Sequence, residues 1–344
     1  MNVLELVRDN IKNIQPYSSA RDEYTESTSS MVFLDANENP FENGVNRYPD
    51  PQQKTVKLKL SEIKNIPVEN ILLGNGSDEV LDLIFRVFCE PNKDEIIILP
   101  PTYGMYKVLA NINAIGIKEI RLTNAFQPKT QTILLGATET SKILFLCSPN
   151  NPTGNNFDND SVEKLLKSFN GIVVIDEAYI DFSEQESWLN RLEEFPNLII
   201  TQTLSKAFGL AGIRLGICYA SKEIIQVLNS IKPPYNVNEL TQERALTQLN
   251  TIERVNNQIK ELKTQKNRLI SELKNIDFIE KIYPSDANFL LIKVDDANKR
   301  YAQLVANGIV IRNRTNQPNC KNCLRISIGT KLENDLLIKT LQQL

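Results

Sequence analysis

The sequence predicts an α/β protein, with a large domain built on a mostly parallel seven-stranded sheet and a smaller α+β domain after it. Its 344 residues are more than one simple core needs and suit two domains. Between about residues 71 and 220, short β-rich runs alternate with helical patterns, which is typical of a parallel sheet. After Pro233 and Pro234 a long helical pattern begins. We assign residues 1–30 to an N-terminal arm, 31–239 to the large domain and 240–344 to the small domain.

The N-terminal arm is predicted to begin with an amphipathic helix. Apolar side chains recur at helical spacing from Val3 to Ile14, with charged residues between them. The polar run Thr25–Ser30 then predicts a loop. We expect this arm to pack near the small domain or on a partner chain.

Seven β-rich runs supply the strands of the large domain. They are Ile71–Leu73, Glu95–Leu99, Ile117–Leu122, Ile143–Cys147, Ile172–Ile175, Leu198–Thr203 and Gly216–Ala220. Helical patterns lie between several of them, at Glu79–Phe88, Tyr106–Asn113 and Ser161–Phe169. This alternation of strands and helices is the basis for expecting parallel strands.

The small domain is predicted to open with one long helix over Leu240–Leu273, because an apolar stripe continues through this polar stretch. Three strands are expected afterwards, at Asn288–Val294, Ile309–Arg312 and Leu324–Ile328. Two helices are expected between and after them, at Asn298–Ala306 and Glu333–Leu344. Strands and helices in this order predict an α+β arrangement.

The charge balance argues against nucleic acid or a membrane as a partner, because the formal net charge is only −3. The first residues carry charges throughout, so they do not have the pattern of a secretory signal. No apolar run is long enough to span a bilayer. We therefore expect a cytoplasmic protein.

Five scattered cysteines do not suggest a disulfide framework. Cys320 and Cys323 form a single CxxC pair, whereas a structural zinc site would need four ligands. We expect two thiols in a loop and no metal site. The chain contains no histidine, which excludes Ser-His-Asp catalysis and histidine-ligated metals. Acid–base chemistry must then use Lys, Asp, Glu, Tyr or Cys.

Polar clusters follow several of the predicted strands, where open α/β sheets bind ligands. The turn Gly74–Glu79 precedes a helix, so its backbone could receive an anion. A tight turn with Asp78 as a helix cap is the simpler alternative. Tyr103 follows the next strand and could stack on a flat ligand, or it could be an ordinary half-buried tyrosine.

Two further strands end at groups suited to a cofactor. Asn151 lies in the proline-rich loop Ser148–Gly154, which would hold its amide rigidly, although the loop could be purely structural. Asp176 ends a wholly apolar strand, where a carboxylate is costly unless a cation pairs with it. A protonated pyridine ring would serve as that cation, and a salt bridge to Arg or Lys is the alternative.

Lys206 is the predicted nucleophile. It follows the predicted buried strand Leu198–Thr203, lies beside Ser205 and precedes Arg214 by eight residues. Desolvation and a nearby cation both lower the pKa of a lysine, which favours the neutral amine needed to form a Schiff base. A surface lysine is the alternative, but the nearby Ser205, Arg214 and Asp176 favour function.

Nine segments together resemble the fold-type I pyridoxal-phosphate-dependent aminotransferases. They are NIQPYSSAR, LDANENP, RYPD, GNGSDE, PPTYGMY, CSPNNPTG, VVIDEAYIDF, TLSKAFGLAGIRLG and LRISIGT. They run in the family's order from the first helix almost to the C-terminus, and they are more similar still to the histidinol-phosphate aminotransferases. The resemblance implies transfer of the amino group of L-histidinol phosphate to 2-oxoglutarate, with pyridoxal 5′-phosphate as cofactor.

The resemblance also implies a role for each matching residue. Lys206 would hold the cofactor and move the proton, Asp176 would pair with the pyridinium nitrogen, and Tyr103 would stack on the ring. The other implied cofactor contacts are Asn151 and Tyr179 at the 3′-oxygen, and Ser77, Asp78, Thr203, Ser205 and Arg214 around the phosphate. Tyr48 would reach that phosphate from a second subunit, so a homodimer is implied.

On the substrate side, Arg325 and Arg312 match anion-binding arginines of the family, and Tyr17 and Asn37 match substrate contacts. Arg325 lies between apolar neighbours, where an unpaired charge would be costly. Arg314 is close enough to Arg312 that either could face the site. The cysteines of CKNC fall in a loop of variable sequence and receive no role.

Other activities of the same fold remain open, namely an aromatic-amino-acid aminotransferase or a threonine-phosphate decarboxylase. A regulatory protein that kept the fold is a further alternative. Such proteins usually carry an added DNA-binding module, and this chain has neither spare residues nor a basic helix for one.

Overall fold

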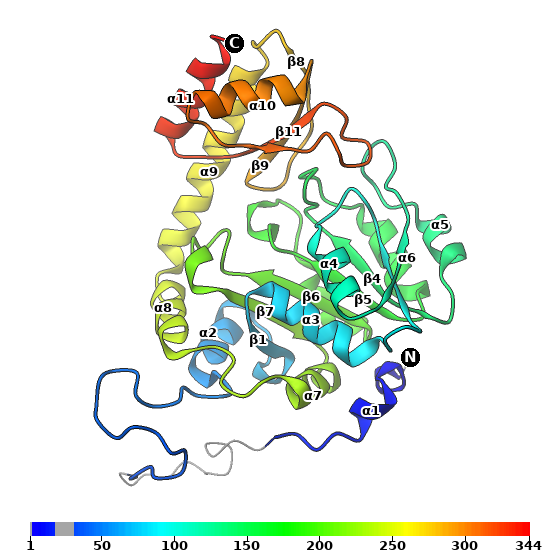
Figure 1. Ribbon diagram of the computed structural model, residues 1–344, viewed down its shortest axis with the longest axis vertical. Helices are drawn as coiled ribbons and strands as arrows, with labels where there is room; N and C mark the ends of the chain where they lie inside the picture. The colour runs from blue at the N-terminus through cyan, green and yellow to red at the C-terminus, as the bar shows by residue number, and fades with distance from the viewer. Residues whose placement is uncertain (1, 18–30) are drawn as a thin grey trace.

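The computed structural model describes residues 2–17 and 31–344, so the loop predicted at Thr25–Ser30 lies outside the described residues. Figure 1 shows a large sheet with helices around it and a smaller sheet-and-helix unit above it. In the described parts of the chain, no helix is long and apolar enough to cross a membrane.

The large sheet has the seven predicted strands, in the order β1-β7-β6-β5-β4-β2-β3. Their bounds are β1 Ile71–Asn75, β2 Glu95–Ile98, β3 Gly116–Glu119, β4 Ser141–Cys147, β5 Ile172–Asp176, β6 Leu198–Thr203 and β7 Leu215–Ala220. Strands β2 to β6 pair in parallel, while β7 runs antiparallel to β1 and β6. The prediction of a mostly parallel sheet is confirmed.

Helices cover both faces of this sheet, because alternate strand residues point to opposite sides. Apolar side chains of α3, α4 and α7 fill the core on one face, and those of α2, α5 and α6 belong to the core on the other. The bounds are α2 Lys54–Lys64, α3 Ser77–Phe88, α4 Met105–Ile112, α5 Thr130–Gly136, α6 Asn159–Ser168 and α7 Lys222–Ile231. Short 3₁₀ turns lie at Val68–Asn70, Ile180–Phe182, Trp188–Glu194 and Ala211–Ile213.

The N-terminal segment is not one continuous helix. It forms a 3₁₀ turn, Val3–Leu6, and a short helix, α1 Asp9–Lys12, with Arg8 extended between them. The backbone N–H of Arg8 donates to Val87 O at 3.0 Å, and its guanidinium bonds Glu90. These contacts hold residues 2–14 on α3 and α7 of the large domain. The prediction that the arm packs near the small domain is therefore wrong for these residues.

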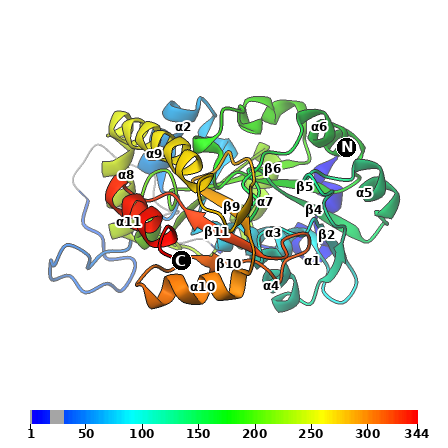
Figure 2. The same cartoon turned by 90° about the horizontal axis from the view of Figure 1, so that it is seen from above.

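The small domain contains a four-stranded antiparallel sheet in the order β10-β11-β9-β8. Its strands are β8 Ile279–Ile282, β9 Phe289–Val294, β10 Arg312–Asn313 and β11 Cys323–Ser327, and its helices are α10 Ala297–Ala306 and α11 Lys331–Leu341. Figure 2 shows α9 along one side of this sheet and α10 along the other.

Two predictions for this region differ from the structure. The long helix is two helices, α8 Glu239–Leu249 and α9 Ile252–Leu273, because Thr251 leaves helical geometry. Helix α8 packs on α2, and α9 runs from there to the small domain (Figure 1). The strand predicted at Ile309–Arg312 shortens to β10, because Gly308 turns the chain and Ile309 N bonds back to Leu304 O of α10.

Candidate active site

Two adjoining cavities lie between the sheet's strand ends and the small domain. The inner cavity, of about 90 Å³, contains every predicted cofactor residue except Tyr48. The outer cavity, of about 440 Å³, is lined on one side by the small domain's Arg312, Arg314, Gln317 and Arg325. Residues common to both cavities are Tyr103, Asn151, Tyr179 and Lys206. The predicted nucleophile therefore lies where the two cavities meet.

Asp176, the last residue of β5, is only 3% exposed. Its carboxylate accepts hydrogen bonds from Tyr106 Oη at 2.6 Å and from Ala178 N at 3.1 Å. Burial raises the pKa of Asp176, although the bond from Tyr106 opposes that change. Within residues 2–17 and 31–344, no Lys or Arg forms an ion pair with it. The structural salt bridge is thus not found, and the carboxylate faces a cavity where a cation could pair with it.

Lys206 follows β6 and opens onto both cavities. Its Nζ lies 5.6 Å from the ring centroid of Tyr179. Partial desolvation by the cavity walls lowers the pKa of Lys206, and the positive charges of Arg325 and Arg214 lower it further, while Asp176 opposes them. These effects favour the neutral amine, which is the nucleophilic form.

The start of α3 and Arg214 form a cradle suited to an anion. Arg214, in the left-handed region at φ 57°, places its guanidinium 3.8 Å from Asp78 and 3.5 Å from Ser205 Oγ. Gly76 has φ 81°, a conformation that favours glycine, and a Cβ there would lie 2.6 Å from Arg214 Nη2, so a larger residue would displace the guanidinium. Gly76 is itself the N-cap and no side chain caps the helix, so Asp78 is not the predicted cap. The free N–H groups and the guanidinium would both attract a phosphate.

The aromatic and amide side chains of the inner cavity are held by one another. Tyr103 Oη donates to Asp78 Oδ1 at 3.1 Å, and Asn151 Nδ2 donates to Tyr179 Oη at 3.5 Å. Burial raises the pKa of both tyrosines, which keeps their hydroxyls protonated near neutral pH. They can therefore act as neutral hydrogen-bond donors toward a ligand.

Three guanidinium groups from the small domain line the outer cavity. Arg312 on β10 pairs in register with Arg325 on β11, and Arg325 Nη1 donates to Asn151 Oδ1. Arg314 follows β10, and burial together with the other two charges lowers its pKa to about 10. Both Arg312 and Arg314 therefore face the site, where sequence alone left the choice open.

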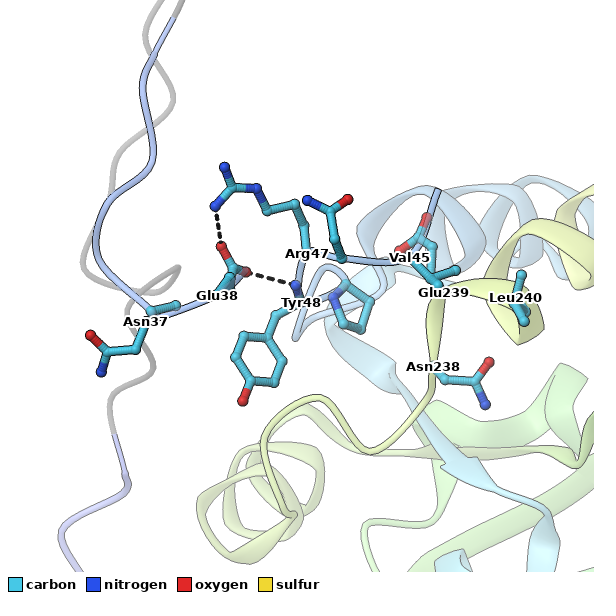
Figure 3. A pocket seen from close by; sticks show the side chains of 11 residues that line it. Asn37, Glu38, Val45, Arg47, Tyr48, Asn238, Glu239 and Leu240 are labelled. Carbon is cyan, nitrogen blue, oxygen red and sulfur yellow. Dashed lines mark hydrogen bonds and ion pairs between the residues drawn. The ribbon is translucent and has the colours of Figure 1, made fainter. Parts of the chain in front are cut away.

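Three predicted residues are not brought to these cavities by a single chain. Figure 3 shows Asn37 and Tyr48 in a separate surface pocket, where Glu38 bonds Arg47 and the backbone of Tyr48. The Tyr48 ring stacks on Tyr235 at 4.5 Å, and Tyr17 is 74% exposed. The roles of Tyr17, Asn37 and Tyr48 stay predictions.

Tyr106 and Gln317 are site residues that the sequence did not single out. Tyr106 lies in the first turn of α4, three residues after Tyr103, and its ring is wholly buried against Phe145 at 4.6 Å. An apolar helical pattern does not distinguish a tyrosine whose hydroxyl bonds a carboxylate from one that only packs.

Cys320 and Cys323 are both buried free thiols. Cys320 lies in the loop after β10, as predicted, whereas Cys323 is the first residue of β11. Among the residues that the structure describes, no group of three or more His, Cys, Asp or Glu side chains could hold a metal ion.

Comparison with known proteins gives one family and closely similar relatives. The sequence matches the family "Aminotransferase class I and II" over residues 23–341. It is 64% identical over 340 residues to a histidinol-phosphate aminotransferase of Flavobacterium johnsoniae, covering 98% of this chain and 97% of that protein. A second histidinol-phosphate aminotransferase, from Flavobacterium psychrophilum, is 62% identical over 343 residues and covers 100% of this chain and 99% of that protein.

Solved structures give the same fold. The histidinol-phosphate aminotransferase of Sinorhizobium meliloti, in complex with pyridoxal-5′-phosphate, superimposes with a TM-score of 0.79 at 21% identity. That comparison covers 86% of this chain and 82% of the other. At this level of identity the likeness concerns the fold alone, and it confirms the predicted two-domain α/β architecture.

Proposed function

Because the chain belongs to the aminotransferase class I and II family, we propose that it transfers the amino group of L-histidinol phosphate to 2-oxoglutarate. The products would be imidazole-acetol phosphate and glutamate. The observation that carries this proposal is the 64% identity, over almost the whole chain, to a histidinol-phosphate aminotransferase. The cavities are consistent with it, since they join a lysine nucleophile to a cluster of arginines.

The inner cavity fits pyridoxal 5′-phosphate on three counts. Its buried Asp176 lacks a cationic partner among the described residues, and a pyridinium nitrogen would supply one. Gly76 leaves room for Arg214 at the start of α3, where a phosphate would bind. Lys206 offers its amine between them. When bound, the cofactor supplies the electron sink for the pair released as the substrate's Cα–H bond breaks.

The chain's own residues would then perform binding and proton transfer. Asp176, oriented by Tyr106, would keep the ring nitrogen protonated, and Tyr103 would pack against the ring. Lys206, displaced by the incoming amine, would take the proton from the substrate Cα as a neutral base. A chain without histidine can carry out this acid–base step, because the lysine whose pKa is lowered supplies it.

The outer cavity would bind the anionic groups of both substrates. L-Histidinol phosphate carries a phosphate and 2-oxoglutarate carries two carboxylates, and guanidinium groups bind both kinds of anion. Arg312 and Arg325 would form the shared site, with the reacting carbon held near Lys206. One cavity can therefore receive the donor and then the acceptor in turn.

The half-reaction tests the proposed substrate. The cofactor-loaded enzyme is mixed separately with L-histidinol phosphate, L-phenylalanine and L-threonine phosphate, and the cofactor's absorbance is followed in a single turnover. We expect conversion to the amine form at the lowest concentration with L-histidinol phosphate. Preference for phenylalanine would replace the proposal with an aromatic aminotransferase, and release of CO₂ from threonine phosphate would replace it with a decarboxylase.

We further propose a homodimer in which Tyr48 reaches the partner's cofactor phosphate. Its support is the segment before α2, where Val32 is 82%, Leu34 87% and Phe41 80% exposed in the single chain. Large apolar side chains exposed together are typical of a surface that a partner covers. Tyr17 and Asn37 belong to the same proposal as substrate contacts.

Mixed dimers test whether Tyr48 acts across the interface. A Lys206→Ala chain and a Tyr48→Ala chain are each impaired alone, but their mixed dimer contains one site with Lys206 from one chain and Tyr48 from the other. We expect mixing to restore activity. No restoration in dimers shown by sedimentation to have exchanged subunits would refute a role for Tyr48 in trans.

We also propose that the protein works in the cytoplasm. All five cysteines are free thiols in the structure, as expected for a protein kept in a reducing compartment. Cell fractionation with antibodies against the chain would test this location.

A further inference from the structure

The outer cavity contains more positive charge than a single carboxylate needs. Arg312, Arg314 and Arg325 all line it, and in residues 2–17 and 31–344 none of them forms an ion pair. One guanidinium can satisfy both oxygens of a carboxylate through two parallel hydrogen bonds. Three guanidinium groups in one cavity repel one another, so the arrangement favours an anion that carries close to two negative charges.

Of the three arginines, Arg314 has the fewest hydrogen bonds to offset the burial of its guanidinium. Its Nε is buried without a hydrogen-bond partner, and among the residues that the structure describes no hydrogen bond from its guanidinium is found. Arg325 also has a buried Nε without a partner, but its Nη1 donates to Asn151 beside the inner cavity. Arg312 is exposed. Leaving a buried donor unpaired is costly, so a ligand atom that accepts from Arg314 would stabilise the complex.

The loop that carries Arg314 is fixed in place. Arg314 N donates to Cys323 O at 2.8 Å, and Asn322 N donates to Thr315 Oγ1 at 2.9 Å, which closes the loop. Asn319 Nδ2 reaches Leu122 O of the large domain at 3.4 Å. The backbone that carries Arg314 therefore does not have to be ordered when a ligand binds, which lowers the entropic cost of the contact.

We propose that Arg314 is a specificity-determining residue that binds the phosphate monoester of the amino donor. This inference rests on the proposed function and adds a third arginine to the two that the family resemblance implied. A phosphate monoester carries about −1.5 to −2 charges near neutral pH and presents three acceptor oxygens. Those oxygens match a cluster of three guanidinium groups, whereas an unphosphorylated amine offers them nothing.

The test compares L-histidinol phosphate with L-histidinol, which differ only in the phosphate. Single-turnover half-reactions give kcat/KM for both amines with the wild-type protein, with Arg314→Gln and with Lys321→Gln. Lys321 is exposed in the same loop, so its variant removes the same charge outside the cavity. We expect Arg314→Gln to lower kcat/KM for the phosphorylated amine by about 10- to 100-fold, mainly through KM, as for loss of a charge-assisted hydrogen bond.

The same variant should change kcat/KM for L-histidinol by less than about threefold, which also shows that it is folded and loaded with cofactor. Equal losses on both amines, or no loss on either, would overturn the role of Arg314. If Arg314→Gln does not fold, Arg314→Lys takes its place. Because lysine keeps the charge but lacks the planar guanidinium, we expect a smaller loss of kcat/KM, and only with the phosphorylated amine. A wild-type enzyme with no preference for the phosphorylated amine would reject the proposed function and this inference together. A preference retained by the variant would reject only the inference.

Discussion

The inner and outer cavities share four residues but differ in how their charges are held. In the inner cavity, Asp176 accepts from Tyr106, and Tyr103 donates to Asp78. In the outer cavity, Arg314 has no partner for its buried Nε. The first pattern fixes the geometry needed for chemistry, because reacting groups must be oriented before the reaction. The second leaves donors available to an incoming anion, so in the proposed reaction the large domain would supply the chemistry and the small domain the recognition of the substrate.

The largest effect expected from this comparison is the loss of Lys206. Lys206→Ala should lower the rate of the half-reaction by at least about 10³-fold, because nucleophile and proton carrier disappear together. Binding of substrate anions in the outer cavity should change little. Lys164→Ala, an exposed lysine of α6, is the matched control. Borohydride reduction and peptide mapping of the wild-type protein should place the cofactor on Lys206, and a label on another lysine would contradict the assignment.

Asp176→Asn should have the next largest effect. Removing one partner of a buried charge pair costs about 2–5 kcal/mol, so the half-reaction should slow by about 30- to 5,000-fold. Asp160→Asn, on the exposed side of α6, is the control. If Asp176→Asn kept the wild-type rate, Asp176 would not be the partner of the ring nitrogen, and the proposed orientation of the cofactor would be wrong.

The sequence predicts the inner cavity well because its residues follow buried strands. A strand covered on both faces is an uninterrupted apolar run, as in Ile172–Ile175, so its end and the polar residue after it are easily located. Asp176 and Asn151 were found in this way, whereas Lys206 follows β6, whose second half, Thr201–Thr203, is polar. Strand β8 was missed because it is only four residues long and its two central residues, Glu280 and Lys281, are both polar, so it has no alternating pattern.

Other features depend on contacts that no local pattern contains. The break at Arg8 follows from its bonds to residues more than 70 positions away in the chain. The break between α8 and α9 falls at Asn250 and Thr251 in a stretch whose apolar stripe continues unbroken. In the proposed homodimer, Tyr48 would reach a site only when a second chain is present, so a single chain does not place it there.

A smaller effect is expected from Tyr106→Phe. The ring would still pack on Phe145, but Asp176 would lose one hydrogen bond, so the half-reaction should slow by about 10-fold. Tyr219→Phe is a closely matched control, because Tyr219 is equally buried and its hydroxyl has no partner. Without its bond from Tyr106, the pKa of Asp176 should rise, which would move the pH dependence of cofactor binding upward in Tyr106→Phe only. An identical pH profile in both variants would mean that Tyr106 acts through packing.

The smallest expected effect is on the melting temperature of the cofactor-free protein, which should depend on pH for a variant in the inner cavity but not for one in the outer cavity. Burial raises the folded-state pKa of Asp176, so its stability contribution is full at low pH and is lost as pH rises through that pKa. Asp176→Asn should therefore raise the melting temperature at pH 8, on the order of 2 °C, and give no gain near pH 4.

Arg314, whose pKa is lowered only to about 10, stays charged across this range. Arg314→Gln should raise the melting temperature equally at both pH values, measured by calorimetry. Two results would contradict this comparison of the cavities. One is a gain in melting temperature for Arg314→Gln that depends on pH, and the other is a gain for Asp176→Asn that is the same at both pH values.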